Sequence, residues 1–212
     1  SDAYPNLFVP AGITFSIWGL IYLLLGVFVV FQLVSRRPYI DRIGWVFVLS
    51  SVANAAWIVA WHYELVLVSL LVMLCLLGSL VAIYLRLFIG RSTGSAAEKW
   101  LVHVSFSVYL GWITVATVAN ATALLVDAGW GRFGLSEAFW AVVAVGGATL
   151  ITLAVLWKRG DLFHAGVVVW AFVGIVLKRS AAGDETSRTV LTAAAVGIGL
   201  VVAMGLLRGR RY

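Results

Sequence analysis

Residues 14–34 read TFSIWGLIYLLLGVFVVFQLV, an apolar stretch without a charged residue. A helix needs about 20 such residues to cross the hydrocarbon core of a bilayer, so the stretch predicts a transmembrane helix. Six further apolar runs follow, separated by short polar connectors: 43–61, 65–87, 101–126, 138–156, 162–177 and 190–207. The sequence therefore predicts an all-α fold, a polytopic integral membrane bundle of about seven transmembrane helices.

The composition excludes a soluble protein. Of the 212 residues, 63% are hydrophobic and 11% are charged, whereas a soluble domain is about half apolar and about a quarter charged. The formal charge of +6 does not indicate nucleic acid binding, because no basic helix or aromatic-basic patch accompanies it. The single cysteine, Cys75, lies inside an apolar run and cannot form a disulfide within one chain.

Basic residues are concentrated in alternate connectors, and cytoplasmic loops of membrane proteins are enriched in Lys and Arg. We therefore predict that the start of the chain lies outside and the C-terminus is cytoplasmic. The connector with Lys178, Arg179 and Arg188 is the exception to the pattern. The residues assigned to the cytoplasmic side are Arg36, Arg37, Arg42, Arg86, Arg91, Lys99, Lys158, Arg159, Arg208, Arg210 and Arg211.

The chain opens with a polar stretch that contains prolines, residues 1–10, rather than with a basic region and a short apolar core. No cleavable signal peptide is therefore expected. A first residue of Ser1 instead of Met indicates a chain that is processed or truncated.

Several chemistries are disfavoured by what the apolar runs lack. All Asp and Glu lie outside the runs or at their edges, and no Lys lies within one. Proton pumps and ion-coupled transporters usually keep an ionisable group at mid-membrane, and a retinal Schiff base needs a lysine. No Ser or Thr is spaced with a His and a carboxylate as a nucleophile would be, and neither phosphate-binding glycine loops nor metal-type clusters occur. We predict no catalytic residue and no metal site.

Ten tryptophans are the strongest local signal. Six lie near the ends of runs, where an indole spans the apolar and wet layers of a bilayer: Trp45, Trp61, Trp100, Trp130, Trp140 and Trp157. Trp18, Trp57, Trp112 and Trp170 lie deeper, where the indole N–H needs a partner or a ligand.

The deep tryptophans have polar companions at helical spacing, so that each set lies on one helix face. The sets are Trp18 with Tyr22, Asn54 with Trp57, and Tyr109 with Trp112, Ala116 and Asn120. They can line one aromatic, amide-rimmed cavity within the bilayer. The alternative is that Asn54 and Asn120 only form hydrogen bonds across neighbouring helices, since an unpaired amide is costly in a membrane.

Three motifs in order resemble the tryptophan-rich sensory protein family, TspO/MBR, which includes the mitochondrial translocator protein. They are PAGITFSIWGLIY at 10–22, NAAW at 54–57, and YLGW at 109–112 followed by Val115, Ala116 and Asn120. The resemblance implies a membrane protein that binds porphyrins, other tetrapyrroles, sterols or drug-like aromatics in a helix-walled pocket. It also implies a ligand-binding set of Trp18, Tyr22, Asn54, Trp57, Tyr109, Trp112 and Asn120.

The chain departs from the family pattern at four positions. The family's paired prolines are reduced to Val9-Pro10, its following Trp is Gly12, and two further prolines are replaced by Val59 and Val108. The loss of the Trp at Gly12 bears on porphyrin selectivity. The resemblance covers roughly the first 125 residues, and the family has a helix before the first motif, so the chain is expected to begin in the loop after that helix.

We therefore predict a TspO-like helical core at 1–126, lacking the family's first helix, and three additional transmembrane helices at 127–212 packed on it. The predicted function is binding, sensing or transporting a hydrophobic aromatic small molecule, porphyrin/tetrapyrrole- or sterol-like. No cofactor is required, although a porphyrin or haem-like molecule can be the ligand.

Two other functions fit parts of the sequence. Small residues at four-residue spacing in the last run permit close helix packing, within the chain, in a homodimer or against a partner in a membrane complex, as a structural or assembly subunit would need. These seams are Ala195, Gly199 and Ala203, and Ala193 with Gly197. His103 and His164 lie toward the inner ends of their helices and could ligate a haem iron axially in an electron carrier.

Overall fold

The computed structural model describes residues 4–35, 39–92 and 94–209. Arg36, Arg37, Arg210 and Arg211, on which part of the predicted orientation depends, lie outside the described residues. Seven helices in the described part are long and apolar enough to cross a membrane, and no strand is found there. The prediction of an all-α polytopic bundle is confirmed.

The seven spans agree with the apolar runs to within a few residues. The first is Gly12–Ser35, in which the short 3-10 helix Gly12–Ser16 leads into α1 (Ile17–Ser35). The others contain α2 (Tyr39–His62), α3 (Val66–Arg86), α5 (Val104–Asp127), α6 (Glu137–Arg159), α7 (Leu162–Ala182) and α8 (Glu185–Gly209). The short α4 (Ala96–Glu98) and a π-helical turn, Lys99–His103, join α5 to form one span, Ala96–Asp127.

Helix boundaries follow ordinary capping chemistry. Ser136 and Asp161 accept hydrogen bonds from the first backbone N–H groups of α6 and α7. Gly160 and Gly183 end the same two helices in the left-handed conformation, at φ 67° and 72°, which glycine adopts without steric penalty. One break comes from glycine inside a predicted run: α2 changes direction at Gly44, where φ is 44°.

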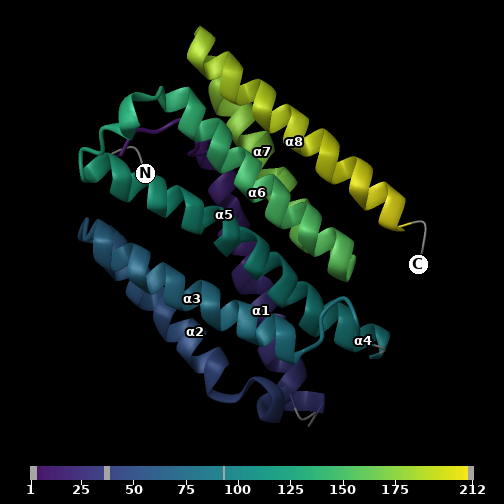
Figure 1. The fold of residues 1–212 in the computed structure, drawn as a ribbon. Helices are drawn as coiled ribbons and strands as arrows, with labels where there is room; N and C mark the ends of the chain where they lie inside the picture. Colours follow the sequence, from purple (N-terminus) through teal and green to yellow (C-terminus); the bar gives the residue numbers. More distant parts are fainter. Residues whose placement is uncertain (1–3, 36–38, 93, 210–212) are drawn as a thin grey trace.

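The span that contains α5 is the centre of the bundle. In this span 78% of the most apolar window is buried, against at most 44% in any other span. It packs against α1, α3 and α7, and α2 covers the outer side of α3 (Figure 1). α6 packs mainly on α8 and α7 and touches α5 little, although the two follow each other in the chain. The residues on α5 are therefore the best placed to build an internal site.

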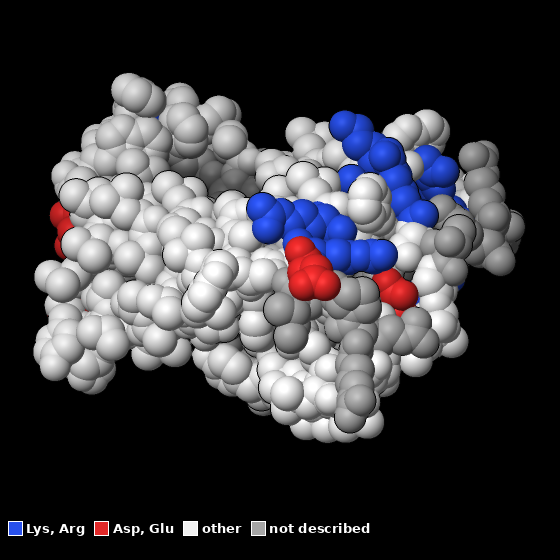
Figure 2. Space-filling view, turned by 90° about the horizontal axis from the view of Figure 1, so that it is seen from below, with Lys and Arg blue, Asp and Glu red and all other residues white. Residues whose placement is uncertain are grey.

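The two ends of the bundle differ in charge. Arg42, Arg86, Lys158 and Arg159 lie near the ends of helices that meet at the end of the bundle where α8 finishes, here called the basic end (Figure 1). Figure 2 shows Lys and Arg gathered toward one part of the face, with only other residues over much of the rest. The N-terminal segment, Tyr4–Ala11, lies toward the opposite end, where the Tyr4 ring contacts Trp61 after α2 has nearly finished. Which end faces the cytoplasm stays a prediction.

Candidate functional site

Trp18 on α1 lies at the centre of an aromatic cluster drawn from three helices. Its ring stacks on Tyr22 and on Trp57, with centroids 5.6 and 5.7 Å apart and interplanar angles of 24° in both pairs. Tyr109 and Trp112 of α5 meet the same indole edge-on, at 6.2 and 6.4 Å. The deep aromatic residues of all three sequence motifs are thus in contact in space.

Beside this cluster lies a cavity of about 300 Å³, here called the aromatic cavity. Four of the seven predicted site residues line it: Trp18, Trp57, Trp112 and Asn120. The other three, Tyr22, Asn54 and Tyr109, are not among its lining residues. Tyr22 and Tyr109 contact Trp18, and Asn54 contacts Tyr22, so these three support the lining residues and do not form the cavity surface.

Both asparagines form the interhelical hydrogen bonds that the alternative interpretation required. The Asn54 amide donates to the Tyr22 hydroxyl at 3.1 Å, and the Ser69 hydroxyl donates to the Asn120 amide oxygen at 3.0 Å. These bonds tie α2 to α1 and α5 to α3. Each amide nevertheless keeps one polar atom, Oδ1 of Asn54 and Nδ2 of Asn120, without a partner among the described residues.

Three further buried polar atoms around the cavity lack a partner in the described part of the chain. They are the indole nitrogens of Trp57 and Trp112 and the Tyr109 hydroxyl. A buried donor or acceptor left unpaired costs about 1–3 kcal/mol, and most such groups in proteins are paired. Their concentration in one place is the chemical feature that sets this region apart.

The N-terminal segment supplies the part of the wall that the motifs did not predict. Tyr4, Asn6, Val9 and Pro10 line the aromatic cavity. Asn6 shapes the segment, since its side-chain oxygen accepts from the backbone N–H groups of Phe8 and Val9 at 3.1 Å. Of these residues only Pro10 belonged to a motif.

The N-terminal segment and the 3-10 helix that follows it, Gly12–Ser16, are both held against α7. The Ala11 N–H donates to the Gly174 carbonyl at 3.0 Å, and the Trp170 indole donates to the Thr14 carbonyl at 3.0 Å. A Cβ added at Gly174 would overlap Thr14 Oγ1 and lie 2.8 Å from Pro10 Cβ, so only glycine permits this approach. The deep Trp170 therefore has a structural partner and lies away from the cavity lining.

Trp61 also lies in a different environment from the one predicted, since the sequence analysis assigned it to the bilayer interface. It stacks on Trp57 with centroids 6.1 Å apart and lines the aromatic cavity, although its position near the end of a run suggested only an interfacial role. The signal that could have identified it is its spacing of four residues from Trp57, one helical turn along the same face.

A larger cavity of about 500 Å³, here called the lateral cavity, lies on the other side of the N-terminal segment. It is lined by the second half of α5, the first turns of α6, the connector between them and residues Asn6, Leu7 and Phe8. Asn6 lines both cavities, so the segment is the wall between them. No sequence motif indicated this cavity.

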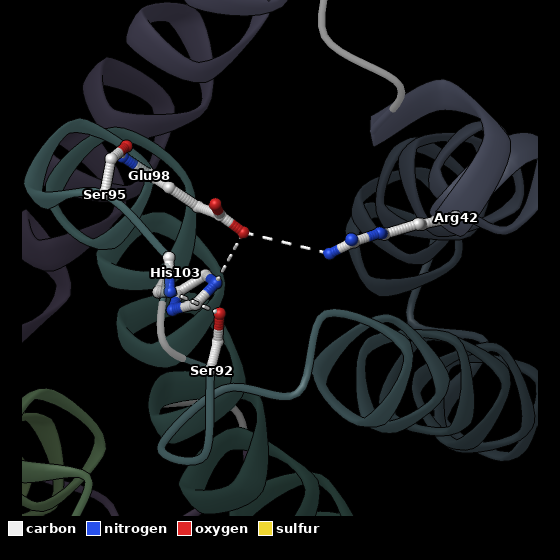
Figure 3. Close-up of polar contacts among 6 residues, drawn as sticks. Arg42, Ser92, Ser95, Glu98 and His103 are labelled. Atoms are coloured by element: carbon white, nitrogen blue, oxygen red, sulfur yellow. Dashed lines mark hydrogen bonds and ion pairs between the residues drawn. The ribbon is translucent and has the colours of Figure 1, made fainter.

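His103 and His164, the two histidines considered as haem ligands, lie near the basic end, and His103 belongs to a polar cluster there. The Glu98 carboxylate lies between His103 Nε2, 3.6 Å away, and Arg42 Nη1, 3.9 Å away, and the Ser95 side chain accepts from the Glu98 N–H (Figure 3). His164 is buried at the start of α7, where the backbone N–H groups of Phe163 and His164 donate to the Asp161 carboxylate. Neither histidine lines either cavity.

The two predicted small-residue seams of α8 face different surroundings. Gly197 is packed so closely against Phe172 and Thr149 that an added Cβ would lie 2.8 Å from each. Ala195, Gly199 and Ala203 are exposed on the outside of the bundle. The seam that contains Gly197 serves packing within the chain, and a partner for the seam of Ala195, Gly199 and Ala203 stays a prediction.

Comparison with known proteins gives one match. The family model described as TSPO-like protein matches residues 1–207. No curated protein and no solved structure matches the chain. The match extends past the motif-bearing residues into the helices after residue 126, and the predicted division of the chain at that point stays a prediction.

Proposed function

The chain belongs to the TSPO-like family, and from this premise we propose that it binds a flat, hydrophobic small molecule, porphyrin/tetrapyrrole- or sterol-like, in the aromatic cavity. Binding is the step that sensing and transport share, and the proposal concerns that step.

The observation that carries the proposal is the group of unpaired polar atoms beside an otherwise apolar cavity. The indole N–H groups of Trp57 and Trp112 can only donate, so the ligand that suits them carries acceptors such as carboxylate, carbonyl or hydroxyl oxygens. A mostly apolar pocket with a few directional polar groups is the usual form of a small-molecule site.

The aromatic rings supply the remaining interaction. Trp18 stacks on Tyr22 and Trp57 and meets Tyr109 and Trp112 edge-on, so these neighbours restrict its ring before a ligand arrives. A ligand that stacks on this cluster meets rigid rings and loses little side-chain entropy in doing so.

The volume of the cavity limits how a ligand can lie. About 300 Å³ is at the lower end of the range of about 300–1,000 Å³ found for ligand pockets. A tetrapyrrole would therefore insert one edge, whereas a smaller aromatic molecule would be enclosed. We expect a sterol and a porphyrin to compete for the same space.

Titration of the purified protein with protoporphyrin IX, followed by tryptophan fluorescence, tests the proposal. We expect the double variant Trp57→Ala, Trp112→Ala to bind roughly a hundredfold more weakly, because two aromatic anchors and two hydrogen-bond donors are removed. The matched control is Trp45→Ala, Trp100→Ala, two tryptophans that are 83% and 62% exposed. Equal affinity of the two double variants would count against the site.

A further inference from the structure

The lateral cavity takes no part in the proposed function. It forms because α5 and α6 diverge, and its side walls include Leu125 and Val143, which are 39% and 46% exposed on the apolar surface of the bundle. A hydrocarbon chain can therefore enter it sideways from the bilayer.

The body of the cavity is suited to an apolar occupant. Its threonines are already satisfied, since Thr117 donates to the Ile113 carbonyl and Thr122 to the Ala119 carbonyl, each at 2.7 Å. The Trp140 indole donates to the Arg132 carbonyl at 3.0 Å. A ligand in this part of the cavity meets methyl groups and ring faces, and the Thr117, Thr122 and Trp140 side chains do not need it as a partner.

Two charges stand at the mouth of the cavity. Arg132 and Glu137 both line it, and neither forms an ion pair with any described residue. Trp130 and Trp140 lie beside them, 4.8 Å apart between ring centroids, and also line the cavity. Tryptophans of this kind mark the level of lipid headgroups in a bilayer.

The connector that carries Arg132 is held in an uncommon conformation. Arg132 and Phe133 have φ values of 54° and 52°, in the left-handed region that residues with a side chain rarely adopt. The Trp130 and Phe133 rings pack edge-on at 5.4 Å, and the Trp140 hydrogen bond fixes the Arg132 backbone. Strain of this kind persists where the surroundings enforce it, often beside a ligand.

We propose that the lateral cavity binds one acyl chain of a zwitterionic phospholipid with a primary amine, with its phosphate on Arg132 and its ammonium on Glu137. A guanidinium pairs well with phosphate oxygens, and a carboxylate accepts hydrogen bonds from an ammonium group. The volume of about 500 Å³ accommodates a single chain rather than a whole lipid. The site is independent of the aromatic cavity and of its ligand.

Native mass spectrometry of delipidated protein tests the site with three lipids of equal chain length: phosphatidylethanolamine, phosphatidylcholine and phosphatidylglycerol. We expect phosphatidylethanolamine to bind most tightly, because phosphatidylcholine cannot donate a hydrogen bond to Glu137 and phosphatidylglycerol has no positive charge. Equal binding of the three lipids, or preference for phosphatidylglycerol, would overturn the proposed headgroup chemistry.

Charge variants test each half of the headgroup site. Arg132→Asn removes the charge but keeps a residue that tolerates positive φ, and we expect about fivefold weaker binding of phosphatidylethanolamine, the scale of an exposed ion pair. Glu137→Gln should reduce its affinity to that of phosphatidylcholine. The matched controls are Arg188→Asn and Glu185→Gln, which lie on α8 and do not line the cavity, and they should leave lipid binding unchanged.

A filling variant tests the acyl-chain part. Ala144→Phe places a ring in the cavity. It should weaken the binding of phosphatidylethanolamine by more than about tenfold, since the space for the acyl chain is lost. Ala203→Phe, on the exposed face of α8, is the control. Where Ala144→Phe does not elute from a sizing column as the unmodified protein does, Ala144→Leu replaces it. A folded filling variant with unchanged lipid affinity would overturn the site.

Discussion

The aromatic cavity and the lateral cavity share Asn6 as a lining residue, but their polar groups are satisfied in different ways. Around the aromatic cavity the indoles of Trp57 and Trp112 have no partner in the described part of the chain. Around the lateral cavity the hydroxyls of Thr117 and Thr122 bond to their own helix. Two adjacent apolar cavities can therefore suit different ligands, since unpaired donors favour an acceptor-bearing molecule and satisfied hydroxyls favour a hydrocarbon chain.

The largest loss of stability and of porphyrin binding is expected at Gly174 on α7, against which the N-terminal segment between the two cavities packs. Gly174→Ala inserts a Cβ against Thr14 and Pro10 and should displace the N-terminal segment from α7. We expect a loss of about 1–3 kcal/mol in stability, the usual result of overpacking, together with weaker porphyrin binding. Thermal unfolding in detergent and porphyrin titration measure the two effects.

Gly166→Ala on the same helix is the control, because an added Cβ there meets no atom within 4 Å. Alanine is favoured over glycine in a helix by roughly 0.5–1 kcal/mol, so this variant should be as stable as the unmodified protein or more so. Equal behaviour of the two variants would show that the segment does not depend on its close approach to α7.

A smaller effect is expected at the two asparagines. Asn120→Leu removes an amide that lines the aromatic cavity, and porphyrin affinity should fall about tenfold, or ~1.4 kcal/mol. Asn54→Leu removes an amide that does not line the cavity and donates to Tyr22, so a smaller loss of affinity is expected. Isothermal titration of both variants orders them, and a larger loss in Asn54→Leu would contradict the assigned cavity lining.

Removing a satisfied hydroxyl should change little. Thr122→Val keeps the shape of the side chain and loses only a bond to the Ala119 carbonyl of the same helix. We expect less than about 0.5 kcal/mol in stability and no change in porphyrin affinity. A clear loss of porphyrin binding in Thr122→Val would mean that the two cavities do not differ as described.

The smallest effect is expected at the start of α8, a helix that lines neither cavity. The Ser187 backbone N–H donates to the Asp184 carboxylate and lowers the pKa of that group below its usual 3.8. A lowered pKa means that the contribution to stability is present above the unfolded value and lost as the pH falls through the folded one. Thermal unfolding between pH 6 and pH 3 should therefore show a slightly shallower decline in Asp184→Asn than in the unmodified protein.

The helices could be predicted because apolar runs depend on short-range spacing. The aromatic cluster joins three helices that are far apart in the sequence, and it could be predicted only from the resemblance of three motifs to a known family. Trp18, Trp57 and Trp112 could be grouped from their motifs, and the apolar runs marked the spans. The π-helical turn at Lys99–His103 and the kink at Gly44 could not be foreseen, because the backbone there is decided by packing between helices.

The wall between the cavities was beyond local reasoning for the same cause. The N-terminal segment is held at Ala11 and Pro10 by Gly174, which lies on another helix far along the chain and carries no side chain that marks it as a contact. The lateral cavity depends on the divergence of α5 and α6. This divergence could not be predicted, because helices joined by a short connector usually pack together. Such features come from tertiary arrangement, which motif spacing does not encode.

The location of a bound tetrapyrrole is the most direct test of the central claim. A crystal structure with zinc protoporphyrin, with the metal located from its anomalous scattering, measures it. We predict a zinc peak beside the aromatic cavity, with the edge of the macrocycle among Trp18, Trp57 and Trp112. A peak at His103 or His164 near the basic end, with no ligand in the aromatic cavity, would contradict binding in the aromatic cavity.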